Sequence, residues 1–125
     1  MVKEIPIEID RYYHEDDVPI RDLLPGVTVR LIWGEKIMMG IVDFEPNATV
    51  PLHKHPHEQC GRILEGSAWF TVGGERQLLR SGNHYVIPGN VEHFVEASNE
   101  GCTALDIWSP IRKEYIVDEV NFFVD

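Results

Sequence analysis

The sequence predicts an all-β, single-domain fold, an antiparallel β-barrel or sandwich of the jelly-roll type. Runs of strand length that are rich in Val, Ile, Phe, Trp and Thr recur along most of the chain. Glycine, proline and asparagine separate these runs at short intervals. Helical periodicity is nowhere long enough to bridge two parallel strands, which favours antiparallel connections.

We divide the 125 residues into three parts. Residues 1–25 are expected to form an N-terminal arm or edge strand, in which alternating isoleucines precede a connector at 19–26. Residues 26–109 form the expected barrel core. Residues 110–125 form a C-terminal segment, in which 111–117 could hold a helical turn. Neither a second domain nor an internal repeat is indicated.

The core is expected to contain eight short strands joined by turns. Gly73 and Gly74 are a strong hairpin signal, because a primed two-residue turn needs positive φ at both central positions. Glu65–Gly66 and Ser98–Gly101 are also interpreted as turns between strands. The expected strands are 27–33, 36–45, 59–64, 67–72, 76–80, 84–87, 91–97 and 102–108.

The charge excludes some partners and the termini bear on location. A net charge of −10 and a pI near 4.9 give a field that repels phosphate backbones and anionic membrane surfaces. The first residues lack the apolar segment of a secretion signal, and no apolar run approaches the roughly 20 residues of a membrane span. We therefore expect a cytoplasmic protein with neither nucleic-acid nor membrane partners. Cys60 and Cys102 are expected to be reduced.

Histidines are concentrated in one short stretch. His53, His55 and His57 occupy five positions, and His93 follows far downstream. Neutral imidazole is the commonest protein ligand for transition metals, so the stretch indicates a metal site rather than a solvated loop. If the stretch is extended, Gln59 faces the same way as His53 and His55. Glu58 faces the opposite way, and His57 remains a rival ligand.

The spacing resembles the two motifs of the cupin superfamily. The first motif is matched by His53, His55, Gln59 and Gly66, and the second by Gly82, Pro88 and His93, with Asn90 where a glycine is more usual. Asn90 tolerates positive φ well. The resemblance implies a cupin jelly roll, or double-stranded β-helix, in which His53, His55, Gln59 and His93 bind one divalent metal. Zinc, nickel, iron, manganese and copper all suit such ligands.

The last expected strand and its exit carry a narrower signal, Asp106-Ile107-Trp108-Ser109-Pro110-Ile111-Arg112. Asp106 could lie inside the barrel as an acid–base group or accept hydrogen bonds at its rim. The chain resembles the KdgF-type pectin-degradation cupins, which linearise unsaturated uronates. That resemblance implies that Asp106 is the catalytic acid–base group, that Trp108 shapes the pocket and that Arg112 holds the sugar acid and assists catalysis. Trp108 stands where phenylalanine is expected.

Three functions remain open. The leading hypothesis is a metal-dependent enzyme that opens or isomerises a small sugar acid. The alternatives are a cupin dioxygenase and a sugar-binding protein without catalysis. Strand 36–45 is apolar on both faces, with Ile37, Met39 and Ile41 on one face and Met38, Val42 and Phe44 on the other. We therefore also expect a homodimer, in which 1–13 adds to the partner's sheet.

Overall fold

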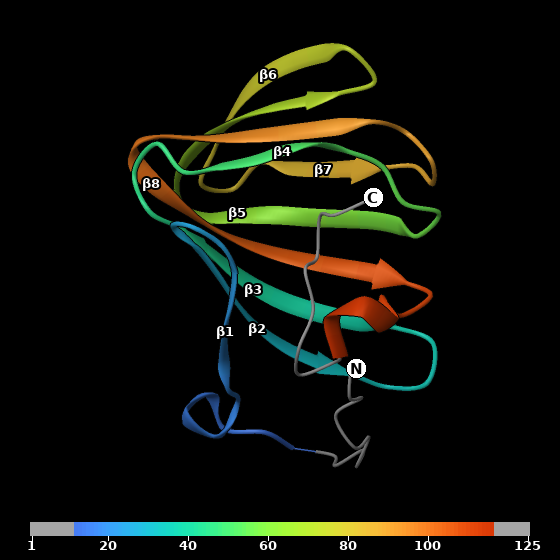
Figure 1. Cartoon of the computed structure of the whole chain (residues 1–125). Coiled ribbons are helices and arrows are strands. Elements are labelled where there is room, and N and C mark those ends of the chain that lie inside the picture. Colours follow the sequence, from blue (N-terminus) through green and yellow to red (C-terminus); the bar gives the residue numbers. More distant parts are fainter. Residues whose placement is uncertain (1–11, 117–125) are drawn as a thin grey trace.

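The computed structural model describes residues 12–116, and almost all of its regular structure is antiparallel strand. Two short 3-10 helices lie near the ends of the described chain, η1 (Glu15–Asp17) and η2 (Lys113–Ile116). Figure 1 shows the strands as β1 (Ile20–Leu24), β2 (Val27–Trp33), β3 (Met38–Phe44), β4 (Thr49–His53), β5 (Glu58–Val72), β6 (Glu75–Arg80), β7 (His84–Ile87) and β8 (His93–Ser109).

The barrel has two layers of strands, and the two long strands β5 and β8 run from one layer into the other. The first part of β5 pairs with β7 and with the end of β8, whereas its second part pairs with β6 and with the start of β8. The remaining strands extend the two layers. β3 pairs with the second half of β8 and is followed by β2 and β1, whereas β4 pairs with the first half of β8. The arrangement confirms the predicted jelly roll (Figure 1).

Two glycines that we interpreted as turns are bends inside continuous strands. Gly66 has φ 72° within β5, and Gly101 has φ 75° within β8. A Cβ on Gly66 would lie 2.1 Å from the carbonyl oxygen of Gly101, so the two backbones touch where both strands pass between the layers. The expected four strands over 59–72 and 91–108 are therefore two.

Other local predictions can be compared directly. Gly73 and Gly74 form the expected hairpin with φ 57° and 85°, and Asn90 has φ 64°. Residues 20–24 form strand β1 rather than a connector, because they pair with β2, and β4 was not expected. The isoleucines of the expected terminal strand lie outside the described residues.

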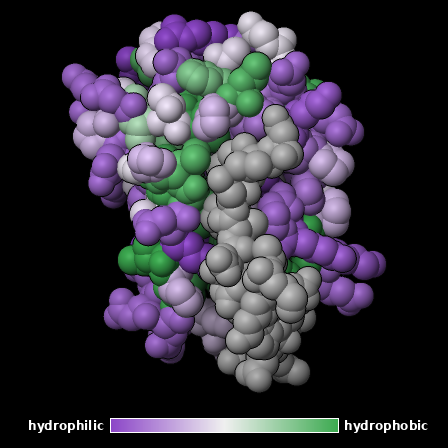
Figure 2. All heavy atoms as spheres, viewed as in Figure 1, coloured by the Kyte–Doolittle hydropathy of each residue, from purple (hydrophilic) through white to green (hydrophobic). Residues whose placement is uncertain are grey.

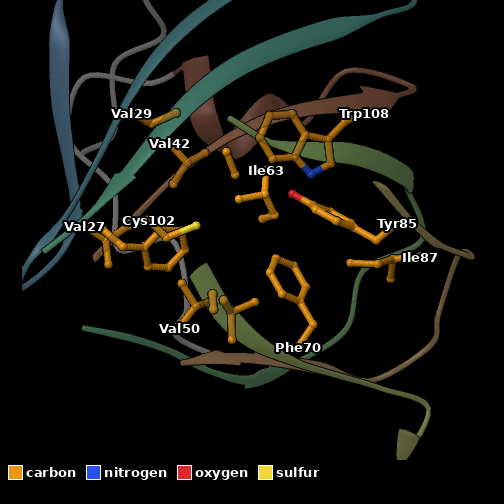
Figure 3. Close-up of a cluster of buried hydrophobic side chains, with 14 of the residues drawn as sticks. Val27, Val29, Val42, Val50, Ile63, Phe70, Tyr85, Ile87, Cys102 and Trp108 are labelled. Carbon is orange, nitrogen blue, oxygen red and sulfur yellow. The ribbon is translucent and has the colours of Figure 1, made fainter. Parts of the chain in front are cut away.

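Alternation along the strands places apolar side chains inside the barrel. Val27 and Val29 of β2 and Val42 of β3 are buried, and Figure 3 shows them facing Ile63 and Phe70 of β5 across the interior. On the face shown in Figure 2, most of the coloured surface is hydrophilic, and hydrophobic residues reach it in patches. No helix within residues 12–116 is long and apolar enough to cross a membrane.

Candidate metal centre and active site

Three histidines converge inside one end of the barrel. His53 ends β4, His55 lies in the loop after it, and His93 begins β8 directly opposite His53. One ring nitrogen from each histidine lies within 4.8 Å of the other two. His55 and His93 are buried and His53 is half-buried. Two nitrogens bound to one zinc ion at about 2.1 Å lie at most about 4.2 Å apart, so small shifts of the rings would let all three share one ion.

Backbone carbonyls orient all three rings. Nδ1 of His53 donates to the carbonyl of Pro51 at 2.8 Å, and Nδ1 of His93 donates to that of Val91 at 2.9 Å. Nδ1 of His55 donates to the carbonyl of His57, also at 2.9 Å. In a neutral ring this leaves the lone pair on Nε2, which is the arrangement of a metal-binding histidine with its outer-shell acceptor.

Burial keeps these histidines neutral and ready to bind a cation. Burial is the largest cause that lowers the pKa of His53 and His55 to about 4, and it also lowers the pKa of His93. Nε2 of His93 is buried and has no hydrogen-bond partner among residues 12–116. A buried polar nitrogen left unpaired is costly, so a cation at this point would satisfy it.

Gln59 places its side-chain amide beside the three histidines. Its Nε2 donates to Oδ1 of Asp106 at 3.0 Å, which turns Oε1 toward His55. Oε1 lies 3.1 Å from Nε2 of His55. Because Nδ1 of His55 carries the proton, Nε2 of His55 and Oε1 of Gln59 are both acceptors and cannot hydrogen-bond to each other. A metal ion bound by both atoms would remove this repulsion. The residues present therefore fit a divalent metal, although they do not select one.

The rival ligands lie elsewhere. Glu58 is exposed, whereas its neighbour Gln59 is buried and faces inward in register with Trp108. His57 is half-buried and is not one of the three clustered histidines, although its ring centroid is 5.4 Å from that of His55. The stretch from His53 to Gln59 is not one extended strand, because residues 54–57 form a loop between β4 and β5. We therefore retain Gln59 as the fourth proposed ligand.

Asp106 lies inside the barrel beside this cluster, not at its rim. It is buried on β8, and Oδ1 accepts hydrogen bonds from Gln59 and from the hydroxyl of Tyr85 at 2.6 Å. Burial raises the pKa of Asp106 to about 6, against the opposing effect of these hydrogen bonds. Burial and the neighbouring carboxyl raise the pKa of Tyr85 well above its usual value, so Tyr85 remains a donor.

Arg112 is buried in the segment after β8. Its Nε donates to Oε1 of Glu114 at 2.8 Å, and Nη1 donates to the hydroxyl of Tyr115 at 2.6 Å. The guanidinium lies 4.0 Å from the centroid of the Tyr115 ring. Arg112 is therefore buried although it is paired with Glu114, and it also lines the cavity.

One cavity joins these groups. Its volume is about 40 Å³, room for a few water molecules. Trp108 is buried in the wall, and its Nε1 has no hydrogen-bond partner in the part of the chain that the structure describes. Figure 3 shows the indole nitrogen and the Tyr85 hydroxyl both turned toward the barrel interior. The residues that line the cavity include His53, Gln59, Phe70, His93, Asp106, Trp108, Arg112 and Tyr115.

Sequence reasoning left Tyr85 unassigned and missed the contact between Arg112 and Tyr115. Tyr85 is a buried residue between exposed His84 and Val86, so strand alternation could have placed it inside. Its partner Asp106 could not be foreseen from alternation, because that contact depends on the register of three strands.

The jelly roll and its three-histidine group define a cupin with a site for a metal ion. Residues 40–108 match the cupin domain family, and the chain belongs to this family. The pectin degradation protein KdgF of Dickeya dadantii is 32% identical over 108 residues, which cover 85% of this chain and 98% of that protein. The predicted resemblance is therefore confirmed at the level of the family and of this relative.

Solved structures agree on the fold. An RmlC-like cupin from Shewanella frigidimarina superposes with a TM-score of 0.82 and 22% identity, covering 86% of this chain and 97% of that one. KdgF from Halomonas sp. gives a TM-score of 0.79 and 23% identity, covering 86% of this chain and 99% of that one.

Proposed function

We propose that this cupin is a metal-dependent enzyme that converts an unsaturated uronate monosaccharide into its linear keto form. One observation carries the proposal: a buried carboxyl, Asp106, is hydrogen-bonded to Gln59 beside the three-histidine group, inside one cavity. The similarity to a pectin degradation protein supports a sugar acid as the substrate. His53, His55, Gln59 and His93 would hold the metal.

Arg112 is the proposed anchor for the substrate carboxylate. Arginine binds a carboxylate in a planar, paired geometry that a diffuse field cannot reproduce. The protein carries a net charge of −10, so an anionic substrate needs a local cation to bind. Trp108 forms the adjoining wall, where its ring packs against Tyr115 with centroids 5.3 Å apart.

Asp106 is the proposed acid–base group, and the reaction conserves all atoms. It takes the proton of the hydroxyl on the anomeric carbon, and the bond from that carbon to the ring oxygen breaks as an aldehyde forms. The ring oxygen keeps the electron pair as an enolate. Return of the proton to carbon 4 then gives the ketone. A pKa of about 6 allows Asp106 to accept and return a proton near neutral pH.

A bound metal would supply Lewis acidity toward the substrate oxygens, and neutral ligands would leave its double charge undiminished. Gln59 is an amide and cannot act as a base, which leaves the proton to Asp106.

The cavity has to enlarge before a sugar acid can enter. Its 40 Å³ is far below the roughly 300 Å³ at the lower end of ligand pockets. Arg112 and Tyr115 line it and belong to the segment after β8. We propose that residues 110–116 move to admit the substrate and then return Arg112 to its carboxylate.

The test is an anaerobic assay of the metal-loaded protein with unsaturated galacturonate, following loss of the conjugated chromophore. We expect acceleration over the slow spontaneous reaction, a loss of about 100-fold or more in Asp106→Asn, and wild-type rates in the exposed control Asp22→Asn. No acceleration by protein of confirmed metal content would contradict the proposed reaction. Turnover that appears only when the assay is repeated in air would support the dioxygenase alternative instead.

We further propose a homodimer that forms through the outer face of the layer in which β3, β8, β5 and β7 lie side by side. Met39, Ile107, Cys60 and Val86 lie in register across four neighbouring strands, and together they form an apolar row on that face. Met39 and Val86 are exposed. Sedimentation at micromolar concentration should give a dimer for the wild type and a monomer for Val86→Lys, and a wild-type monomer would contradict the proposal.

A further inference from the structure

Tyr85 has no part in the proposed reaction, but it is hydrogen-bonded to Asp106, the proposed acid–base group. Tyr85 lies on β7, its ring is buried, and its hydroxyl donates to Oδ1 of Asp106 at 2.6 Å. Phe70 packs against the ring, with centroids 4.4 Å apart. The ring is therefore held by packing on one side and by a short hydrogen bond at its end.

A missing side chain on the intervening strand makes this contact possible. Gly61 of β5 is in register with Tyr85 on one side and with Asp106 on the other. A Cβ on Gly61 would lie 2.5 Å from both Cζ and the hydroxyl oxygen of Tyr85. The tyrosine ring thus occupies the space over β5 that any other residue at position 61 would fill.

Both donors that reach Asp106 bind the same oxygen. The hydroxyl of Tyr85 and the amide of Gln59 converge on Oδ1, and within residues 12–116 no donor is placed on Oδ2. A carboxylate oxygen has two lone pairs, so Oδ1 is fully used. Oδ2 is the oxygen left for a ligand in the cavity that Asp106 lines.

We propose that Tyr85 is a positioning residue that locks Oδ1 of Asp106 and so reserves Oδ2 for the proton exchanged with the substrate. The inference rests on the proposed function. Tyr85 does not transfer the proton itself, because its only hydroxyl hydrogen is directed to Oδ1. Without Tyr85, the carboxyl group keeps one donor instead of two and can rotate, so either oxygen can face the substrate.

The primary test is Tyr85→Phe, which keeps the ring and its packing against Phe70 but removes the hydroxyl. We expect kcat to fall about 10- to 100-fold, KM to stay within about twofold, and metal content to equal that of the wild type. Tyr12→Phe is the matched control, since Tyr12 is 87% exposed. An unchanged kcat, a rise in KM alone, or a loss of metal would each overturn the positioning role.

A second measurement separates this inference from the reaction itself. A hydrogen bond of 2.6 Å should give a downfield, slowly exchanging hydroxyl proton in the NMR spectrum of the metal-loaded protein, absent from Tyr85→Phe. If the wild type does not accelerate the assay, the proposed function fails while this resonance still reports the contact. Absence of the resonance, or its presence with unchanged kcat in Tyr85→Phe, would overturn the inference.

Discussion

Nε2 of Gln59 donates to Oδ1 of Asp106 at 3.0 Å, while Oε1 of the same amide lies 3.1 Å from Nε2 of His55. One neutral side chain therefore connects the three-histidine group with the buried carboxyl. An amide can serve both neighbours because it offers an acceptor at one end and donors at the other. A carboxylate at this position would offer only acceptors.

We expect the Gln59→Glu variant to bind metal more tightly and to have a lower kcat. A negative ligand attracts a divalent cation more strongly than an amide does, but it cannot donate to Asp106 and adds a like charge beside it. The metal dissociation constant should fall and kcat should fall at least about tenfold. Competition with a chelator and the chromophore assay measure the two effects. Glu58→Gln, on the exposed neighbour, is the control and should change neither.

Asp106→Asn should stabilise the metal-free protein at high pH only. The usual pKa of an aspartate carboxyl, 3.8, applies to Asp106 in the unfolded chain. In the fold, burial favours the protonated form and raises this pKa to about 6. The contribution of this carboxyl to stability is thus present below about pH 4 and is lost as the pH rises through 6, a change of about 3 kcal/mol.

The amide has no ionisation to lose, so Asp106→Asn should gain up to about 3 kcal/mol over the wild type at pH 8 and little at pH 4. Chemical denaturation of both metal-free proteins at the two pH values measures this. An equal difference at both pH values would show that ionisation of Asp106 does not affect the free energy of unfolding.

His53→Ala and His93→Ala should each weaken metal binding by at least about 100-fold, since even outer-shell partners of metal ligands contribute 10- to 100-fold. His57→Ala is the matched control from the same stretch and should retain its metal, because His57 is not part of the cluster. Metal content after dialysis gives the answer. Loss of metal in His57→Ala alone would contradict the proposed ligands.

Motif spacing predicted the histidine pair and its distant partner because the loops beside β4 and β8 are short and the three histidines lie in or next to them. His53 and His93 are directly opposite residues on β4 and β8, although β4 itself was not foreseen. The prediction of Gln59 over Glu58 depended on one extended strand from His53 to Gln59, whereas β4 ends at His53 and β5 begins at Glu58. It still selected the buried residue, because β5 alternates from its first residue.

The bends and the Tyr85 contact could not be predicted, for two physical reasons. Gly66 and Gly74 both have positive φ, but Gly74 ends a strand in a hairpin and Gly66 bends a strand that continues. The difference depends on which strands pair, a tertiary effect that local patterns do not contain. The Tyr85 contact with Asp106 requires three strands in one register with Gly61 between them.

Trp108→Phe should weaken substrate binding while preserving the pocket wall. The indole Nε1 is buried and unpaired within the described residues, so a substrate oxygen that accepts from it would contribute about 1 kcal/mol. We expect KM to rise about fivefold with kcat nearly unchanged. An unchanged KM would show that the indole serves only for packing, for instance against Tyr115.

Gly66→Ala should test the bend between the layers more severely than any hairpin glycine. A Cβ at this position would meet the carbonyl of Gly101 at 2.1 Å, and φ is 72°, so the variant has both a backbone clash and an unfavourable conformation. We expect a loss of more than about 3 kcal/mol in the free energy of unfolding.

Gly74→Ala is the matched control. Its φ is 85°, but a Cβ there has no atom within 4 Å, so only the conformational cost of about 1–2 kcal/mol remains. Denaturant unfolding of the two variants separates strain from collision. Equal losses would mean that β5 can move away from β8 at Gly66, in which case the close contact of these strands is not what shapes the barrel around the histidine cluster.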